Sequence, residues 1–101
     1  MPELPEALLS QLPDLIDRLR GETAGYLDQP GEQQLWYNRG YANGIVLSLQ
    51  QLQQRGRLGT RVPDAAAVVT GHLGTPWGRA YRHGESMGSR ETYEVTGDPA
   101  A

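Results

Sequence analysis

The first quarter of the chain repeats apolar residues at intervals of three and four. This spacing places them on one face of an α-helix. Pro13 interrupts the pattern, and because proline lacks an amide donor and crowds the preceding turn, it must begin a second helix or kink the first. We therefore expect a short helix near residues 3–11 and a longer one near 13–27, nearly continuous with each other. Their core-facing stripe is formed by Leu4, Leu8, Leu12, Leu15, Ile16 and Leu19.

A second apolar stripe follows the turn sequence Asp-Gln-Pro-Gly at residues 28–31. It predicts a long helix over about residues 31–55 that stops at Gly56 or Gly59. Two long amphipathic helices joined by a short turn are typical of an antiparallel hairpin. The stripe consists of Leu35, Trp36, Ala42, Ile45, Val46, Leu49 and Leu52.

The pattern weakens after Gly59. Pro63 and the next residues predict a short helix that closes at Gly74, and Thr75 followed by proline predicts another that closes at Gly84. Residues 85–101 have little apolar spacing and are expected to be flexible, with a short strand over 92–96 only if another segment pairs with it. The predicted fold is all-α: one helical domain over 1–84, built on a long antiparallel hairpin with one or two short C-terminal helices, and a flexible tail over 85–101.

Composition narrows the class of protein. The 101 residues include no cysteine, which excludes disulfides and thiolate metal sites, and the formal net charge is −3. No apolar run approaches the roughly 20 residues that span a bilayer, and the first residues are acidic where a signal peptide would be basic. These features predict a cytoplasmic protein that has no membrane partner and no cofactor.

The stretch WYNRGYANG, residues 36–44, places two glycines on a predicted helix. Three interpretations are open: the glycines let another helix approach closely, they open a concave site for a small ligand or peptide, or they mark a break between two helices. We favour the first, because each glycine costs a helix roughly 1 kcal/mol relative to alanine and a packing gain can offset that cost. The predicted partner-binding residues are Trp36, Tyr37, Gly40, Tyr41, Asn43 and Gly44.

This glycine face lies beside the apolar stripe, so the second helix has a wider contact surface than one neighbouring helix covers. A small chain supplies few neighbours. We therefore expect self-association, most simply a twofold homodimer in which two hairpins pair as a four-helix arrangement.

Two strings suggest chemistry but lack its context. GESMG, residues 84–88, matches the G-x-S-x-G turn of hydrolases, yet that turn needs a preceding strand and a later histidine, whereas His72 and His83 both come before Ser86. The two histidines are also eleven residues apart, which places no pair of metal ligands on one helix face. Neither a catalytic set nor a metal site is predicted.

Arginine is concentrated in the second half of the chain and is interleaved there with Trp77 and Tyr81. Such a surface is typical of single-stranded nucleic-acid binding, although arginine near a helix carboxyl end also complements the helix dipole. The candidate residues are Arg55, Arg57, Arg61, Arg79 and Arg82.

The sequence therefore predicts a non-enzymatic helical interaction protein, such as an adaptor, regulator or inhibitor, whose partner is a second copy or another protein. The alternatives are a nucleic-acid-binding protein that uses the arginine-rich segment 55–82, and a small-ligand-binding protein with a pocket at Trp36 and Tyr41.

Overall fold

The computed structural model describes residues 3–29, 31–52, 62–64, 71–72 and 74–96, with the backbone alone for 3–10 and 95–96. Within these ranges the chain is helical and contains no strand, which agrees with the predicted all-α class. The elements are α1 (Glu3–Glu22), the 3₁₀ turn η1 (Tyr26–Asp28), α2 (Gln33–Gln51) and α5 (Pro76–Thr96).

Helix α1 runs through Pro13 without ending, although two helices were expected here. Proline removes one amide donor, but Leu12 and Ile16 on either side of it are buried in one apolar cluster. That burial holds the two flanking turns in place. The predicted division into two helices is therefore absent, while the predicted core-facing stripe is present at Leu12, Leu15 and Ile16.

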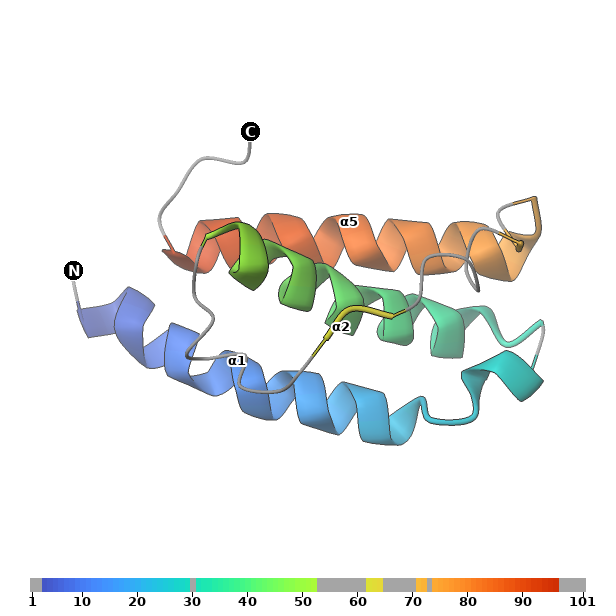
Figure 1. Cartoon of the computed structure of the whole chain (residues 1–101), viewed down its shortest axis with the longest axis horizontal. Helices are drawn as coiled ribbons and strands as arrows, with labels where there is room; N and C mark the ends of the chain where they lie inside the picture. Colours follow the sequence, from blue (N-terminus) through green and yellow to red (C-terminus); the bar gives the residue numbers. More distant parts are fainter. Residues whose placement is uncertain (1–2, 30, 53–61, 65–70, 73, 97–101) are drawn as a thin grey trace.

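The chain reverses between α1 and α2, as Figure 1 shows. Gly31 takes a positive φ of 97° in this connection, a conformation that costs glycine little. The two helices meet through the apolar cluster, in which Leu12 and Ile16 of α1 pack against three α2 residues, Ile45, Val46 and Leu49.

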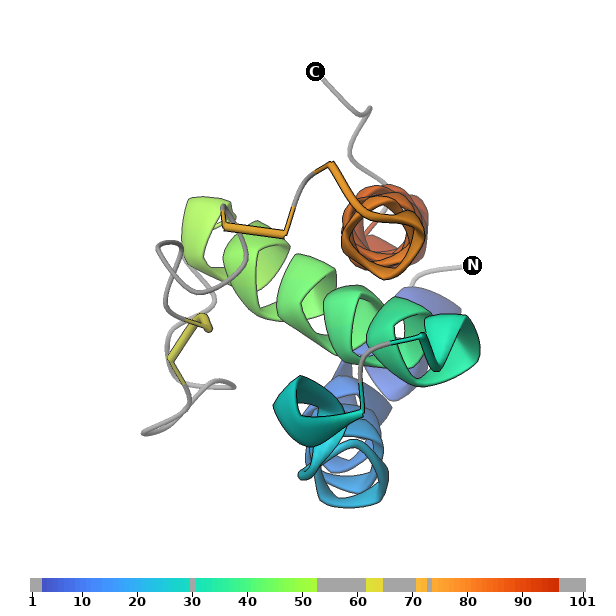
Figure 2. The same ribbon diagram turned by 90° about the vertical axis from the view of Figure 1, so that its right-hand side faces the viewer.

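The closest helix pair is α2 and α5, not the first two helices. The two run in the same direction (Figure 1), since Asn43 bonds to Glu85 and, further along both helices, Ser48 bonds to Ser89. Viewed from the end, α2 lies between α1 and α5 (Figure 2). Among the described helices, α2 therefore has α1 and α5 of its own chain as neighbours on two faces.

Helix α5 differs from the prediction most. One 21-residue helix covers Pro76–Thr96, where the sequence suggested a stop at Gly84, a flexible tail from residue 85 and a conditional strand over 92–96. Gly84 and Gly88 do not end the helix, because both are buried against the backbone of α2. The predicted boundary at residue 84 therefore falls inside a helix, and residues 97–101 lie outside the described part.

The start of α5 agrees with its prediction. The amide of Gly78 donates to the Thr75 hydroxyl at 3.0 Å, so Thr75 caps the helix and Pro76 occupies its first turn. Most of the short helix predicted between Pro63 and Gly74 lies outside the described residues. Residues 62–64 form neither a helix nor a strand, and they are joined to the helices by hydrogen bonds at Val62 and Asp64.

Candidate functional site

The predicted glycine face is the contact surface for α5. A Cβ added to Gly44 would lie 2.9 Å from the carbonyl carbon of Glu85 and 2.9 Å from the Ser89 nitrogen, closer than side chains approach backbone. Gly40 faces the backbone of Tyr81 in the same way. This supports the interpretation that the glycines admit another helix, and identifies that helix as the chain's own α5.

The contact is reciprocal. Gly84 faces the Tyr37 backbone, with 2.9 Å from an added Cβ to its carbonyl carbon, and Gly88 faces Tyr41 at 3.0 Å. Each helix thus contributes two glycines spaced four residues apart, and close backbone approach replaces side-chain interdigitation. The GESMG string is part of this interface, and Ser86 lies exposed on a continuous helix without the strand and turn of a hydrolase.

Trp36 belongs to an aromatic core rather than to a binding surface. Its side chain is fully buried, it packs edge-on against Tyr26 at 5.0 Å between ring centres, and its Nε1 donates to the Gln29 carbonyl. His72 packs edge-on against Trp36, and Tyr81 stacks near Tyr26. Trp36, one of the two residues at which a small-ligand pocket was predicted, is therefore packed among the protein's own side chains.

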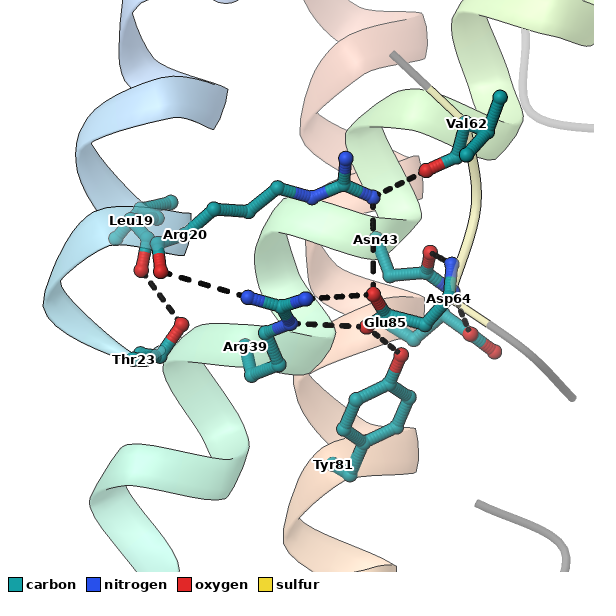
Figure 3. A network of polar contacts seen from close by, with 9 residues as sticks. All are labelled: Leu19, Arg20, Thr23, Arg39, Asn43, Val62, Asp64, Tyr81 and Glu85. Atoms are coloured by element: carbon teal, nitrogen blue, oxygen red, sulfur yellow. Dashed lines mark hydrogen bonds and ion pairs between the residues drawn. The ribbon is translucent and has the colours of Figure 1, made fainter. Parts of the chain in front are cut away.

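A polar network joins α1, α2 and α5 to residues 62–64 (Figure 3). Its centre is the Asp64 carboxylate, whose side chain is 8% exposed. Arg39 donates to both oxygens, from Nε at 3.1 Å and from Nη2 at 2.9 Å, and Tyr81 donates its hydroxyl at 2.6 Å. The Arg20 Nη2 atom lies 3.7 Å from the Asp64 Oδ1 atom and also donates to the Val62 carbonyl. We call Asp64 with Arg20, Arg39 and Tyr81 the Asp64 clamp.

Asn43 connects the Asp64 clamp to α5. Its side-chain oxygen accepts from the Asp64 amide at 2.7 Å, and its nitrogen donates to Glu85 at 2.8 Å (Figure 3). Asn43 was predicted to contact a partner, but it is buried and joins two parts of the same chain.

The Asp64 clamp is a structural contact between elements that lie far apart in the sequence. Both carboxylate oxygens accept hydrogen bonds, Oδ1 from Arg39 and Oδ2 from Arg39 and Tyr81. Burial lowers the pKa of Arg39, but its hydrogen bonds to Asp64 and the attraction of that charge raise it on balance. Arg39 therefore stays charged, and the bidentate pair fixes residues 62–64 across α1, α2 and α5.

Stability is expected to fall as the pH rises above about 10. Burial, followed by the hydrogen bond to Asp64, raises the pKa of Tyr81 well above its ordinary value of 10.0. The folded protein then keeps a proton that the unfolded chain has lost, so the stabilisation is complete below the unfolded pKa and is lost as pH rises toward the folded pKa.

Urea denaturation at pH 8 and at pH 10.5 measures this loss. The chain has no lysine or cysteine, so tyrosines dominate its titration in that interval. In Tyr81→Phe, the free energy of unfolding should decrease less between these two pH values. If the free energy of unfolding decreased equally in the wild type and in Tyr81→Phe, Tyr81 would not be the source of the pH dependence.

A cavity of about 520 Å³ lies between α1 and α5, with α2 as its floor. We call it the α1–α5 groove. Leu12, Leu15 and Ile45 form its apolar wall, and Tyr41 donates its hydroxyl to the Glu91 carboxylate inside it. Gln11, Asp14, Arg18 and Thr92 complete the lining. Of the six predicted partner-binding residues, Tyr41 is the one that lines this groove.

A second, shallower hollow of about 540 Å³ lies where α2 and α5 begin. Tyr37 packs edge-on against His83 there, and Arg79 is part of its lining. Arg79 also donates to the Gly74 carbonyl. The two histidines lie against different aromatic rings, and within the described part of the chain no three metal-binding side chains come together.

The predicted nucleic-acid surface is described only in part. Arg79 and Arg82 are exposed on α5, and Arg82 pairs with Glu85 at 2.9 Å. Arg55, Arg57 and Arg61 lie outside the described residues.

Sequence reasoning missed two carboxylates. Asp64 was assigned to the start of a helix, and Glu91 to the flexible tail. The spacing of nearby residues could have predicted the helix that contains Glu91. Tyr81, Gly84, Gly88 and Thr92 recur at intervals of three and four residues, which indicates a helix face made of aromatic and small side chains instead of aliphatic ones.

Comparison of the chain with protein-family models, curated proteins and solved structures finds no match. Over the described residues, the structure therefore defines a class: a helical protein built on a parallel pair of helices, α2 and α5, that pack closely through their glycines. Among the described residues, no helix is both long and apolar enough to cross a membrane.

Proposed function

We propose that this protein is a non-enzymatic helical interaction protein, an adaptor, regulator or inhibitor, that binds a partner helix in the α1–α5 groove. The observation that supports this is the groove itself: a cavity of about 520 Å³ with an apolar wall and a half-buried carboxylate. Amphipathic helices bind in grooves of this kind, with apolar anchors in the floor and charged contacts at the edge.

The arrangement of the three helices favours the same proposal. In the end-on view α2 lies between α1 and α5 (Figure 2), and α1 packs less closely against α5 than against α2. A helix placed in the groove would contact α1 and α5 together and complete a four-helix arrangement.

Self-association is one form of this proposal, but the glycine face of α2 is no longer the surface through which we expect it. The glycine face of α2 is buried by α5 of the same chain, so α2 needs no second copy to cover it. If two copies associate, we propose that they do so through the α1–α5 groove.

A photo-reactive amino acid in place of Gln11 tests the proposal in the host cell. Gln11 is exposed at the edge of the groove, and Ser86, exposed on α5 outside the groove, is the matched control. Illumination should give a discrete cross-linked product from position 11 but not from position 86, and Leu15→Gln should remove it. The mass of the product tells a second copy, at twice 11.1 kDa, from a different protein.

Absence of a product from position 11, or the same products from both positions, would contradict the proposal. Products that contain nucleic acid would instead support the arginine-rich alternative, whose affinity should fall steeply with added salt.

A further inference from the structure

The three half-buried carboxylates of the described residues do not have equivalent partners. Asp64 pairs with Arg39, and Glu85 pairs with Arg82. Glu91 accepts a hydrogen bond from the Tyr41 hydroxyl, but no arginine of the described part lies within ion-pair distance of it. Among the described residues, Glu91 is therefore the one of these three carboxylates without an arginine partner.

A tyrosine hydroxyl satisfies one oxygen of Glu91 but does not neutralise its charge. Burial and the adjacent Glu91 carboxylate raise the pKa of Tyr41, so this hydroxyl stays a neutral donor at physiological pH. A carboxylate removed from bulk water and left without a cation is unfavourable, and a cation that reaches it gains a charge-assisted hydrogen bond in a partly desolvated setting.

The groove also selects the shape of that cation. Its wall of Leu12, Leu15 and Ile45 adjoins Glu91, so an apolar stem and a charged head would both find complementary surface. Arginine and lysine side chains have this construction, since they bury their methylene stems along apolar surface and keep the charge at the tip.

From this geometry we infer that the α1–α5 groove receives an arginine or lysine side chain from the partner helix, with its stem on Leu12, Leu15 and Ile45 and its cationic head on Glu91. The inference rests on the proposed function, because it names the part of the partner that the groove recognises. Asp14 and Arg18 are both exposed at the edge of the groove on α1. Their charges are opposite, which leaves Glu91 to set the preference for a cation.

The test uses the full chain, labelled with ¹⁵N, and two fragment probes of the same shape. n-Butylguanidinium carries the charge of an arginine head on an apolar stem, and n-butylurea is its uncharged isostere. Only the guanidinium should shift the amide resonances of Tyr41, Ile45 and Thr92 in a saturable way. Glu91→Gln should weaken its binding by about tenfold or more, because the charged half of the contact is lost.

Glu94→Gln is the matched control, since Glu94 is exposed one turn from the groove lining and already pairs with Arg90. This variant should bind n-butylguanidinium like the wild type. Equal shifts by both probes, or undiminished binding to Glu91→Gln, would overturn the inference.

Arg18→Gln tests a competing occupant. If n-butylguanidinium binds this variant but not the wild type, Arg18 of the same chain fills the site, and the inference is wrong. These outcomes are distinct from failure of the proposed function. If neither fragment binds but position 11 still gives the cross-link, the groove binds a partner by other contacts and only the inference is wrong. If the cross-link is absent, the proposed function itself is wrong.

Discussion

Gly44→Ala is expected to lower the free energy of unfolding by about 3 kcal/mol, the upper range for overpacking a tight interior. The new methyl would lie 2.9 Å from the carbonyl carbon of Glu85 and equally close to the Ser89 nitrogen. Both neighbours are backbone atoms of a helix, so relief requires α2 and α5 to separate. The separation would weaken the Asn43–Glu85 and Ser48–Ser89 hydrogen bonds as well.

Gly21→Ala is the matched control, because Gly21 also lies inside a helix but has no atom near its missing side chain. Alanine there should raise stability by about 0.5–1 kcal/mol through helix propensity alone. Urea denaturation followed by circular dichroism measures both variants. If Gly44→Ala is as stable as the wild type, the close packing of α2 on α5 is wrong.

Asp64→Asn should cost about 3–5 kcal/mol, the range for removing one partner from a buried ion pair. Asparagine keeps the shape of the side chain but leaves the Arg39 guanidinium, which lies 4.9 Å from the centre of the Tyr26 ring, without its counter-charge. The contact between residues 62–64 and the three helices would weaken at the same time.

Arg82→Gln provides the comparison for Asp64→Asn, since it removes an ion pair whose arginine side chain is 54% exposed. Its effect should stay within about 1 kcal/mol. The double variant Asp64→Asn with Arg39→Gln should be less destabilised than the sum of the two single changes, because the second removes the unpaired charge that the first leaves behind. Strict additivity would show that the two side chains do not interact.

The spacing of aliphatic residues predicted the packing of the first half of the chain. Leu12, Ile16, Ile45 and Leu49 recur at helical intervals, and the structure buries all four in one cluster. Helix bounds were less predictable: Pro13 was expected to interrupt α1 and does not, because propensity is weak compared with the burial of the adjacent turns.

Helix α5 escaped the sequence pattern because its buried face contains hardly any aliphatic residues. Gly84, Gly88 and Thr92 have the spacing of a helix face, but glycine and threonine are poor helix formers and usually indicate turns. They become favourable only when another backbone lies against them. The same dependence held for WYNRGYANG, whose glycines suggested a helix contact without identifying the helix.

The sequence alone predicted that the chain is helical and that its aliphatic core lies in the first half, and it favoured a helix-contact surface at Gly40 and Gly44 over a ligand site or a helix break. Tertiary structure decided that α5 occupies this surface, that Asp64 meets Arg39 from 25 residues away, and that Glu91 lies beside Leu12 and Ile45. The physical reason is the distance along the sequence over which each kind of information acts. Helix periodicity is encoded by residues three and four apart, whereas close backbone packing and buried charge pairing depend on which helices become neighbours, which local spacing does not specify.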